Sequence, residues 1–259
     1  MRAIPHDDRS EVLARVRQYA SSRMGRDAGL FLPLVDRYYE RVAAEDLAAR
    51  AVPDLFGTAL AHLRLARRRR PGELNVAVCS PTFDEDGFAC PHTVVQVVAD
   101  DMPFIPESLE TELARRGLGL HLALHPVFEV ARGAGGELLS VLGEGEPGNG
   151  EAVRESFHHI EVDRQADPAV LDRLREDLYR VLGDVRAVHE DRAAMRERAV
   201  EIARGLPEEA PVVDAEDRAE AADFLRWLAD DHFTFLGYRE YELVGAPGGE
   251  VLVAVDGSG

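Results

Sequence analysis

The stretch HTVVQVVADDMPFIPESLETELARRGLGLHLALHPVFEVAR, residues 92–132, decides the fold of this chain. Its opening segment, 92–99, is largely apolar and β-branched, which predicts a strand buried on both faces. Asp100, Asp101 and Pro103 follow at once, and residues of these types favour turns over strands. The sequence therefore predicts a central strand that ends abruptly in a polar turn.

A helix is predicted directly after that turn. Pro106 suits a first helical turn, where its missing N–H needs no partner. Apolar residues then recur at helical spacing over 106–116, and Gly117 provides the stop. A second apolar strand is predicted at 120–130. The stretch thus forms a strand, a turn, a helix and a strand in succession.

Four long and unusual segments carry a resemblance to a known family. They are HTVVQVVADDMPF (92–104), HLALHPVFEVAR (121–132), ESFHHIEVDR (155–164) and FLRWLADDHFTFLGYREYEL (224–243). Through them, most of the chain resembles the N-terminal region of the large bacterial NAD-dependent glutamate dehydrogenases. In that family the region is built from ACT-like modules, which have a βαββαβ fold and often sense amino acids. The dehydrogenase domain lies far beyond it.

The resemblance implies a regulatory and assembly role for this region, and no catalysis by the chain alone. The parent enzyme would convert L-glutamate, NAD and water to 2-oxoglutarate, ammonia and NADH. NAD would bind in the parent's catalytic domain, and no cofactor is expected in this region. An amino-acid effector and a homo-oligomeric parent enzyme are the expected partners. The alternative is a purely structural oligomerisation module without a small-molecule ligand.

Composition limits the other function classes. The chain has 259 residues, 46% of them hydrophobic, and a formal net charge of −18. That charge argues against nucleic acid as a partner, because duplex binding depends on neutralising phosphates. No apolar run approaches the roughly 18 residues that span a bilayer, and the N-terminus lacks the apolar stretch of a signal peptide. A cytoplasmic protein without a membrane partner is therefore expected.

The chain contains no lysine, so every basic side chain is an arginine. Arginine stays protonated and is a poor general base or Schiff-base nucleophile. A Walker A loop requires a lysine, and the glutamate dehydrogenases that the chain resembles use catalytic lysines. No catalytic residue is therefore expected. The arginine run at 67–70 precedes Pro71 and Gly72, which favours a helix-capping role over a phosphate or partner site.

The pattern outside the central stretch predicts the remaining elements. Helical periodicity fills the chain before residue 72, and the alternating segment 74–79 is expected to pair with the central strand. The Gly-rich segment 133–137 joins two apolar strands, so it predicts a hairpin and not a dinucleotide site. A further strand is predicted at 155–162, and Asp167 followed by Pro168 opens a long helix.

The expected fold class is α+β, a helical N-terminal section beside an ACT-like antiparallel sheet. The strands at 92–99, 120–130 and 155–162 should share this sheet, because short turns favour antiparallel neighbours. The helices at 106–116 and 168–183 should cover one common face. The expected organisation is a helical section, an ACT-like domain, a linker and the beginning of a second, truncated α+β module, at 1–72, 73–204, 205–217 and 218–259.

The turn after the central strand is the candidate ligand site. The resemblance implies this place, because ACT-like modules commonly bind small ligands between their first strand and first helix. A helix N-terminus offers N–H groups to a carboxylate, while an aspartate can receive an amino group. Many amino-acid-binding ACT modules carry a glycine in this turn, and this chain does not. The alternative assigns these residues to the turn and the core. The candidate set is Asp100, Asp101, Met102, Pro103, Phe104 and Ser108.

Histidines and cysteines suggest no metal site. His121 and His125 are spaced to share a strand face, whereas the adjacent His158 and His159 must point to opposite faces. A zinc site needs three or four converging ligands. Cys79 and the CPH segment at 90–92 together fit no structural zinc motif. Packed or hydrogen-bonded histidines and reduced thiols are therefore expected.

Three acidic residues near the predicted strand 155–162 are candidates for a pair of catalytic carboxylates. Glu161 and Asp163 alternate onto one strand face, but no partner acid is identifiable for them or for Glu155. A solvated sheet edge, or a pair with Arg164, is expected instead.

Overall fold

The computed structural model describes residues 8–142, 151–209, 214–246 and 249–257. The chain divides into two compact units, residues 1–183 and 184–259. The division falls inside one helix, α7 (Pro168–Glu209). This division differs from the expected domain boundaries in two ways. The N-terminal helices pack on the sheet and do not form a separate section, and residues 205–209 of the expected 205–217 linker belong to α7. Residues 210–213 of that linker lie outside the described part.

Six strands form one sheet in the first unit, in the order β1-β2-β6-β4-β5, with β3 also paired to β6. The longest strand, β6, pairs antiparallel with β2 along one edge, and with β3 and β4 along the other. The strands are β1 (Asn75–Cys79), β2 (Thr93–Asp100), β3 (Leu120–Leu124), β4 (Val127–Arg132), β5 (Leu138–Leu142) and β6 (Glu151–Val162).

The single strand expected at 120–130 is two strands, β3 and β4. His125 and Pro126 interrupt it, because proline has no N–H to donate to a sheet. The Pro126 carbonyl still accepts a hydrogen bond from the Phe157 N–H at 2.9 Å. β3 therefore pairs with the C-terminal half of β6, and β4 with its N-terminal half.

The Gly-rich segment 133–137 joins β4 to β5 as the expected hairpin. Gly136 has a φ of 85°, and a side chain there would meet the Arg69 carbonyl oxygen at 2.7 Å. Glycine permits both the left-handed backbone and this close approach. The Arg69 N–H donates to the Gly136 carbonyl at 2.9 Å, which attaches the chain after α4 to the hairpin.

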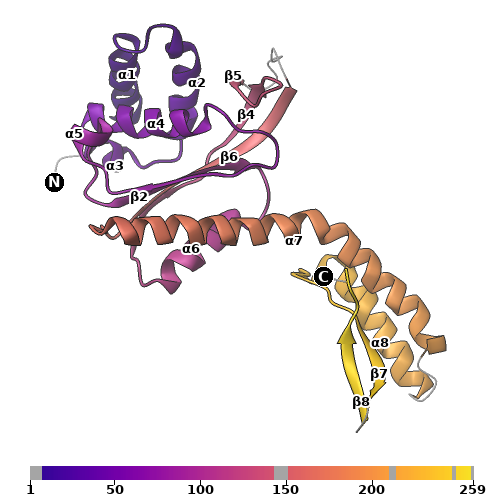
Figure 1. The fold of residues 1–259 in the computed structure, drawn as a ribbon. Coiled ribbons are helices and arrows are strands. Elements are labelled where there is room, and N and C mark those ends of the chain that lie inside the picture. Colours follow the sequence, from indigo (N-terminus) through magenta and orange to yellow (C-terminus); the bar gives the residue numbers. More distant parts are fainter. Residues whose placement is uncertain (1–7, 143–150, 210–213, 247–248, 258–259) are drawn as a thin grey trace, which may run out of the picture. The chain divides into compact units, whose positions relative to one another are not determined.

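The N-terminal helices cover one face of the sheet (Figure 1). Phe31, Leu34 and Leu63 pack with Phe128 and Phe157 of the sheet, and all five are fully buried. Burying each such side chain contributes about 1.5–3 kcal/mol, so this section shares a core with the sheet. The helices are α1 (Asp8–Ser21), η1 (Gly25–Asp27), α2 (Ala28–Tyr38), α3 (Ala44–Ala48) and α4 (Val52–Ala66).

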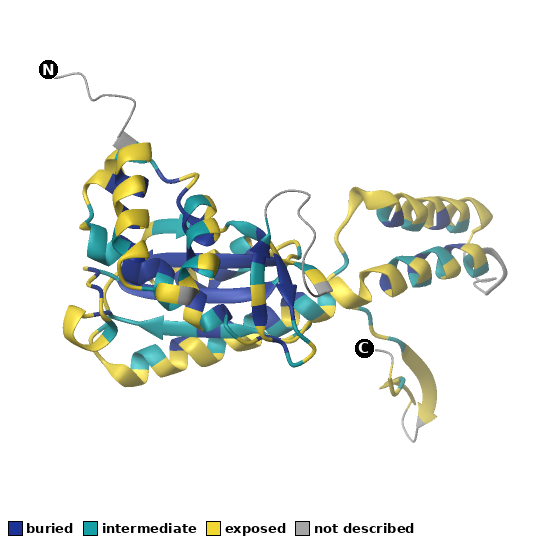
Figure 2. Cartoon of the chain, turned by 90° about the horizontal axis from the view of Figure 1, so that it is seen from above, coloured by how far each residue is buried: buried dark blue, intermediate teal, exposed yellow. Residues whose placement is uncertain are grey.

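The other face is covered by α6 (Ile105–Arg115) and by the first part of α7 (Figure 1). The apolar stripe of α7 is regular, with Leu174, Leu178 and Leu182 buried at intervals of four residues. The three predicted strand segments therefore share one sheet, and the two predicted helices lie on a common face. A short helix, α5 (Phe83–Asp86), lies between β1 and β2. Figure 2 shows the sheet as the buried centre of this unit.

The second unit contains the last part of α7, two helical segments and a β-hairpin. Within this unit, Arg198 of α7 donates hydrogen bonds to Tyr238 and Glu240. The hairpin is exposed along its described length (Figure 2). In the described parts of the chain, no helix is long and apolar enough to cross a membrane. The elements are α8 (Ala215–Trp227), η2 (Leu228–His232), β7 (Tyr241–Ala246) and β8 (Gly249–Ala254).

Candidate functional site

The turn between β2 and α6 holds both candidate aspartates in ion pairs. Asp100 accepts hydrogen bonds from Arg69 Nη2 at 2.6 Å and from the Gly72 N–H at 2.7 Å. Asp101 pairs with Arg154 Nη2 at 2.8 Å. The partner of Asp100 is fully buried, whereas the Arg154 side chain is 65% exposed. The two carboxylates therefore differ in how firmly they are held.

Phe104 ends this turn in a conformation that is unusual for its side chain. Its φ of 71° and ψ of 0° are left-handed, the region that favours glycine. Phe104 precedes α6, and no side chain caps that helix end. Met102 is partly buried, whereas Pro103 and Phe104 are exposed, and Ser108 lies in the first turn of α6. The turn therefore has a glycine-like backbone at a phenylalanine.

Glu155 lies at the centre of a buried ion cluster on β6. Its Oε1 accepts hydrogen bonds from Arg69 Nη2 at 2.8 Å and Arg132 Nε at 2.6 Å. Arg132 Nη2 donates to the second oxygen, Oε2, at 2.7 Å. All three side chains are at most 3% exposed. The expectation of a solvated sheet edge was wrong for Glu155, because its face of β6 lies under the N-terminal helices.

The arginine run at 67–70 is distributed over several partners. α4 ends at Ala66, so these residues run beside the β4–β5 hairpin and beyond the helix end. Arg67 pairs with Asp27, and Arg68 lies near Glu137. Arg69 enters the ion cluster. The capping role expected for the run is therefore wrong for Arg69, which the fold buries completely.

A second buried carboxylate, Glu161, lies on the same face of β6. Arg50 donates to both of its oxygens, and His159 Nε2 and His92 Nδ1 lie within hydrogen-bond distance at 3.2 and 3.0 Å. Its side chain is 1% exposed. Burial alone would raise the pKa of Glu161, but the hydrogen bonds with His159 and Arg50 lower it well below its usual range. The expected exposed edge was wrong here also.

Asp163, two residues further along, is exposed and pairs with His121 at 2.8 Å. The expected partner, Arg164, instead donates to the backbone carbonyls of Cys90 and Ser80. The ring of His121 stacks on His92 with a centroid distance of 3.9 Å. Glu161 therefore contacts His92 in the loop before β2 directly, and Asp163 contacts it through His121.

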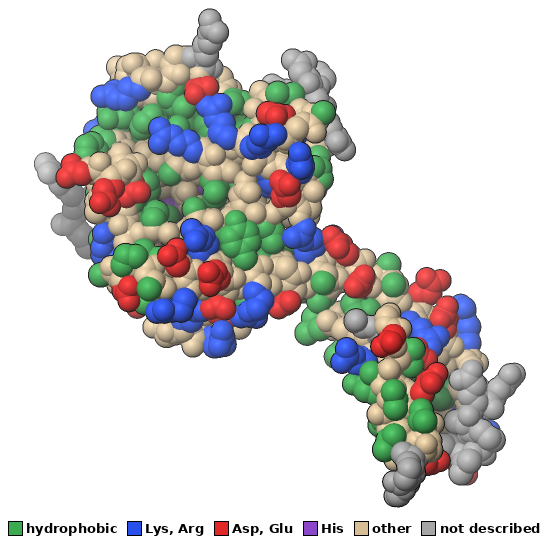
Figure 3. Space-filling model, in the orientation of Figure 1, with side chains coloured by type: hydrophobic (Ala, Val, Ile, Leu, Met, Phe, Trp, Pro, Cys, Tyr) green, Lys and Arg blue, Asp and Glu red, His purple; other side chains and the backbone are tan. Residues whose placement is uncertain are grey.

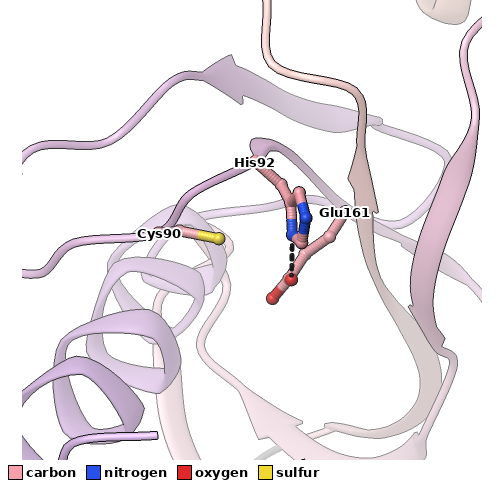
Figure 4. A group of neighbouring side chains, drawn as sticks. All are labelled: Cys90, His92 and Glu161. Atoms are coloured by element: carbon pink, nitrogen blue, oxygen red, sulfur yellow. Dashed lines mark hydrogen bonds and ion pairs between the residues drawn. The ribbon is translucent and has the colours of Figure 1, made fainter.

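Cys90, His92 and Glu161 converge on one point below that loop (Figure 4). One ligand atom of each lies within 4.8 Å of the others, a spacing that could surround a metal ion. Arg50, however, occupies both oxygens of Glu161 with its own positive charge. Burial also raises the pKa of the Cys90 thiol, which disfavours the thiolate that binds metals. The cluster is thus already satisfied as a hydrogen-bonded ion pair.

Besides His159, two histidines are buried in the described part of the first unit. His62 lies 2.9 Å from the Tyr38 hydroxyl through Nδ1 and 3.1 Å from the Val97 carbonyl through Nε2. His158 lies on the opposite face of the sheet from His159, as predicted, and within 2.9 Å of the Ser156 hydroxyl. Burial lowers the pKa of both, to about 3 for His158. Both rings are therefore neutral at physiological pH.

A hollow of about 300 Å³ lies where the end of α2 meets the break between β3 and β4. We call it the α2 groove. Three arginines line it, Arg37 from the end of α2, Arg41 from the turn after it and Arg154 from β6. No sequence pattern singles it out, because its residues are far apart in the chain. The two arginines at 37 and 41 are the one local signal, and arginines at such a spacing are common on protein surfaces.

Residues 34–178, more than half of the chain, match a protein family described as glutamate dehydrogenase, ACT1 domain. The chain belongs to this family. The match begins within α2 and ends within α7. It includes the whole sheet of the first unit, both buried carboxylates and the turn before α6. The resemblance and the α+β fold class predicted from the sequence are thereby confirmed.

Curated relatives extend the likeness of this ACT1-family chain into its second unit. NAD-specific glutamate dehydrogenase of Halomonas elongata is 36% identical over 91% of this chain. The Pseudomonas aeruginosa protein of the same name is 34% identical over 84% of the chain, and the Mycobacterium tuberculosis one is 34% identical over 69%. The matches span only 15%, 13% and 11% of those proteins' own lengths.

Proposed function

We propose that this chain is a regulatory region of an NAD-dependent glutamate dehydrogenase and binds a free amino acid. The parent enzyme would oxidise L-glutamate to 2-oxoglutarate and ammonia, with NAD held in a separate catalytic domain. The family match and the names of three relatives support the parent activity. In this assignment, the chain itself binds no cofactor and carries out no oxidation.

The left-handed backbone of Phe104 is the observation that carries the binding proposal. A bulky residue held at positive φ costs on the order of 1–3 kcal/mol, and such strain is concentrated at ligand sites and switches. The residue lies where the first N–H groups of α6 are left without a side-chain cap. A carboxylate seated there would satisfy those N–H groups and gain from the helix dipole, worth about 0.3–1 kcal/mol when exposed.

The amino group of the ligand would approach Asp101. Its partner Arg154 is largely exposed, and exposed ion pairs contribute only about 0–1 kcal/mol, so an incoming ammonium can compete. Asp100 is less accessible to a ligand, because the buried Arg69 and the Gly72 N–H already hold its oxygens. Ser108, in the first turn of α6, would add a hydroxyl.

Asp101→Asn and Ser108→Ala should weaken amino-acid binding without unfolding the chain. A charged hydrogen bond contributes about 1.5–3 kcal/mol, so Asp101→Asn should raise Kd about 10- to 100-fold. Ser108→Ala should have a smaller effect in the same direction. Titration calorimetry of each variant gives the values. The control is Asp84→Asn, which makes the same change at an exposed site on α5. Unchanged affinity in both test variants would contradict the assigned site.

An assembly role without a ligand is the second candidate. The β7–β8 hairpin supports it, because its two strands expose large apolar side chains, with Leu243 at 60% and Leu252 at 68%. Exposed apolar strands favour pairing with another protein surface, here a second copy in a homo-oligomer. Amino-acid binding and assembly are compatible in one regulatory region, but a chain that bound no amino acid would retain only the second role.

A further inference from the structure

We propose that the α2 groove is a binding site for a small dicarboxylate. This proposal goes beyond the amino-acid site at the β2–α6 turn, with which the groove shares the Asp101–Arg154 ion pair. The groove is lined by side chains from α2, from β6 and from the break between β3 and β4. Its volume of about 300 Å³ is at the lower end of the range for small-molecule sites.

The charge of the groove is opposite to that of the chain. The formal net charge of the protein is −18, yet the described residues lining the groove include three arginines and one acidic residue, Glu40. Arg37 and Arg41 are exposed, and neither forms an ion pair with another described residue. Figure 3 shows arginine side chains on the surface of the first unit, among acidic and hydrophobic ones. A local positive field of this kind attracts small anions.

The arrangement of the arginines favours an anion with two charged ends. Arg37 and Arg41 approach from the α2 side, and Arg154, which also pairs with Asp101, approaches from β6. A planar guanidinium binds a carboxylate through two parallel hydrogen bonds, so each side can receive one carboxylate group. His125, exposed at the break between β3 and β4, supplies a further polar group on the same wall.

The remaining lining suits the carbon chain between two carboxylates. Leu124, Pro126 and Val127 contribute an apolar surface to the groove. A short methylene chain gains from contact with such a surface, whereas inorganic phosphate has no apolar part to bury. The expected ligand therefore has two carboxylates separated by a few carbon atoms, and an amino group is not required.

Calorimetric titration of the full chain with glutarate tests the proposal. Glutarate has two carboxylates and no amino group, so its binding gains nothing from Asp101, and a loss of binding in the groove variants distinguishes the groove from the N-terminus of α6. Saturable binding is expected, and Arg37→Gln and Arg41→Gln should each raise Kd about 10-fold or more. Both side chains are exposed, so neither change disturbs the core. The monoamide of glutarate should bind more weakly than glutarate by a similar factor.

Arg173→Gln is the matched control, because Arg173 is exposed on α7 and lies outside the groove. It should leave the affinity for glutarate unchanged. Three outcomes would overturn the proposal: no saturable heat with glutarate, unchanged affinity in both groove variants, or phosphate binding as tight as that of glutarate. Because the amino-acid site uses Asp101 and Ser108, binding of glutarate with no amino-acid binding would refute only the function proposed above.

Discussion

Glu155→Gln should lower the free energy of unfolding of the first unit by about 3–5 kcal/mol. The substitution keeps the size of the side chain and removes its charge. Arg132 and Arg69 would then remain buried, with the carboxylate that both contact replaced by a neutral amide. Breaking a buried pair by removing one partner is costly, because Arg132 then loses its counter-ion without regaining water, while Arg69 keeps only its pair with Asp100. Urea unfolding followed by circular dichroism measures the change.

The control for this substitution is Glu110→Gln on the exposed side of α6. It makes the same chemical change at a surface position and should alter the stability by less than about 0.5 kcal/mol. A loss in Glu155→Gln no larger than the loss in this control would show that the ion cluster does not stabilise the sheet against the N-terminal helices.

The stability of the first unit should fall as the pH is lowered from 7 to 5. His158 is neutral in the folded protein and its pKa there is about 3, against about 6.5 when unfolded. The unfolded chain therefore binds more protons in this interval, and stability is lost as the pH falls below the unfolded value. For this one group the loss between pH 7 and 5 is about 2 kcal/mol. His62, whose pKa is also lowered by burial, adds to it in the same direction.

His158→Gln isolates this contribution, because glutamine can keep a hydrogen bond to Ser156 and does not titrate. Its stability should fall about 2 kcal/mol less than that of the original chain over the same interval, measured by urea unfolding at each pH. The interval stays above the usual pKa of carboxyl groups, so acid titration of the aspartates and glutamates contributes little. Equal losses in the two proteins would contradict the buried, neutral state of His158.

The sheet could be predicted from the sequence because its strands are marked by local patterns. The β-branched run before Asp100 and the Gly-rich hairpin at 133–137 were identified from period and composition alone. The break at Pro126 was missed, although a proline within an apolar run is a local signal against one continuous strand. The first unit's extent was missed as well, because the joining of helices and sheet depends on packing between residues distant in sequence.

The buried carboxylates show where local patterns fail. Glu161 stands between two apolar residues and Glu155 between two polar ones, and both patterns are typical of solvated positions. Their actual partners, Arg69 and Arg50, come from distant parts of the chain. A charged residue is buried only where the fold supplies its counter-ion, and no short-range signal reports that. The α2 groove could not be predicted for the same reason. The turn before α6 could be predicted as a candidate site, because its residues are consecutive or nearly so in the sequence.

Thermal melting of the chain with each of the twenty amino acids tests the central claim most directly. A ligand that binds only the folded state, present at 100 times its Kd, adds about 2.7 kcal/mol to the stability and raises the melting temperature. At least one amino acid should do so, and the increase should grow with its concentration. If none of the twenty raises the melting temperature at millimolar concentration, the chain is not an amino-acid sensor.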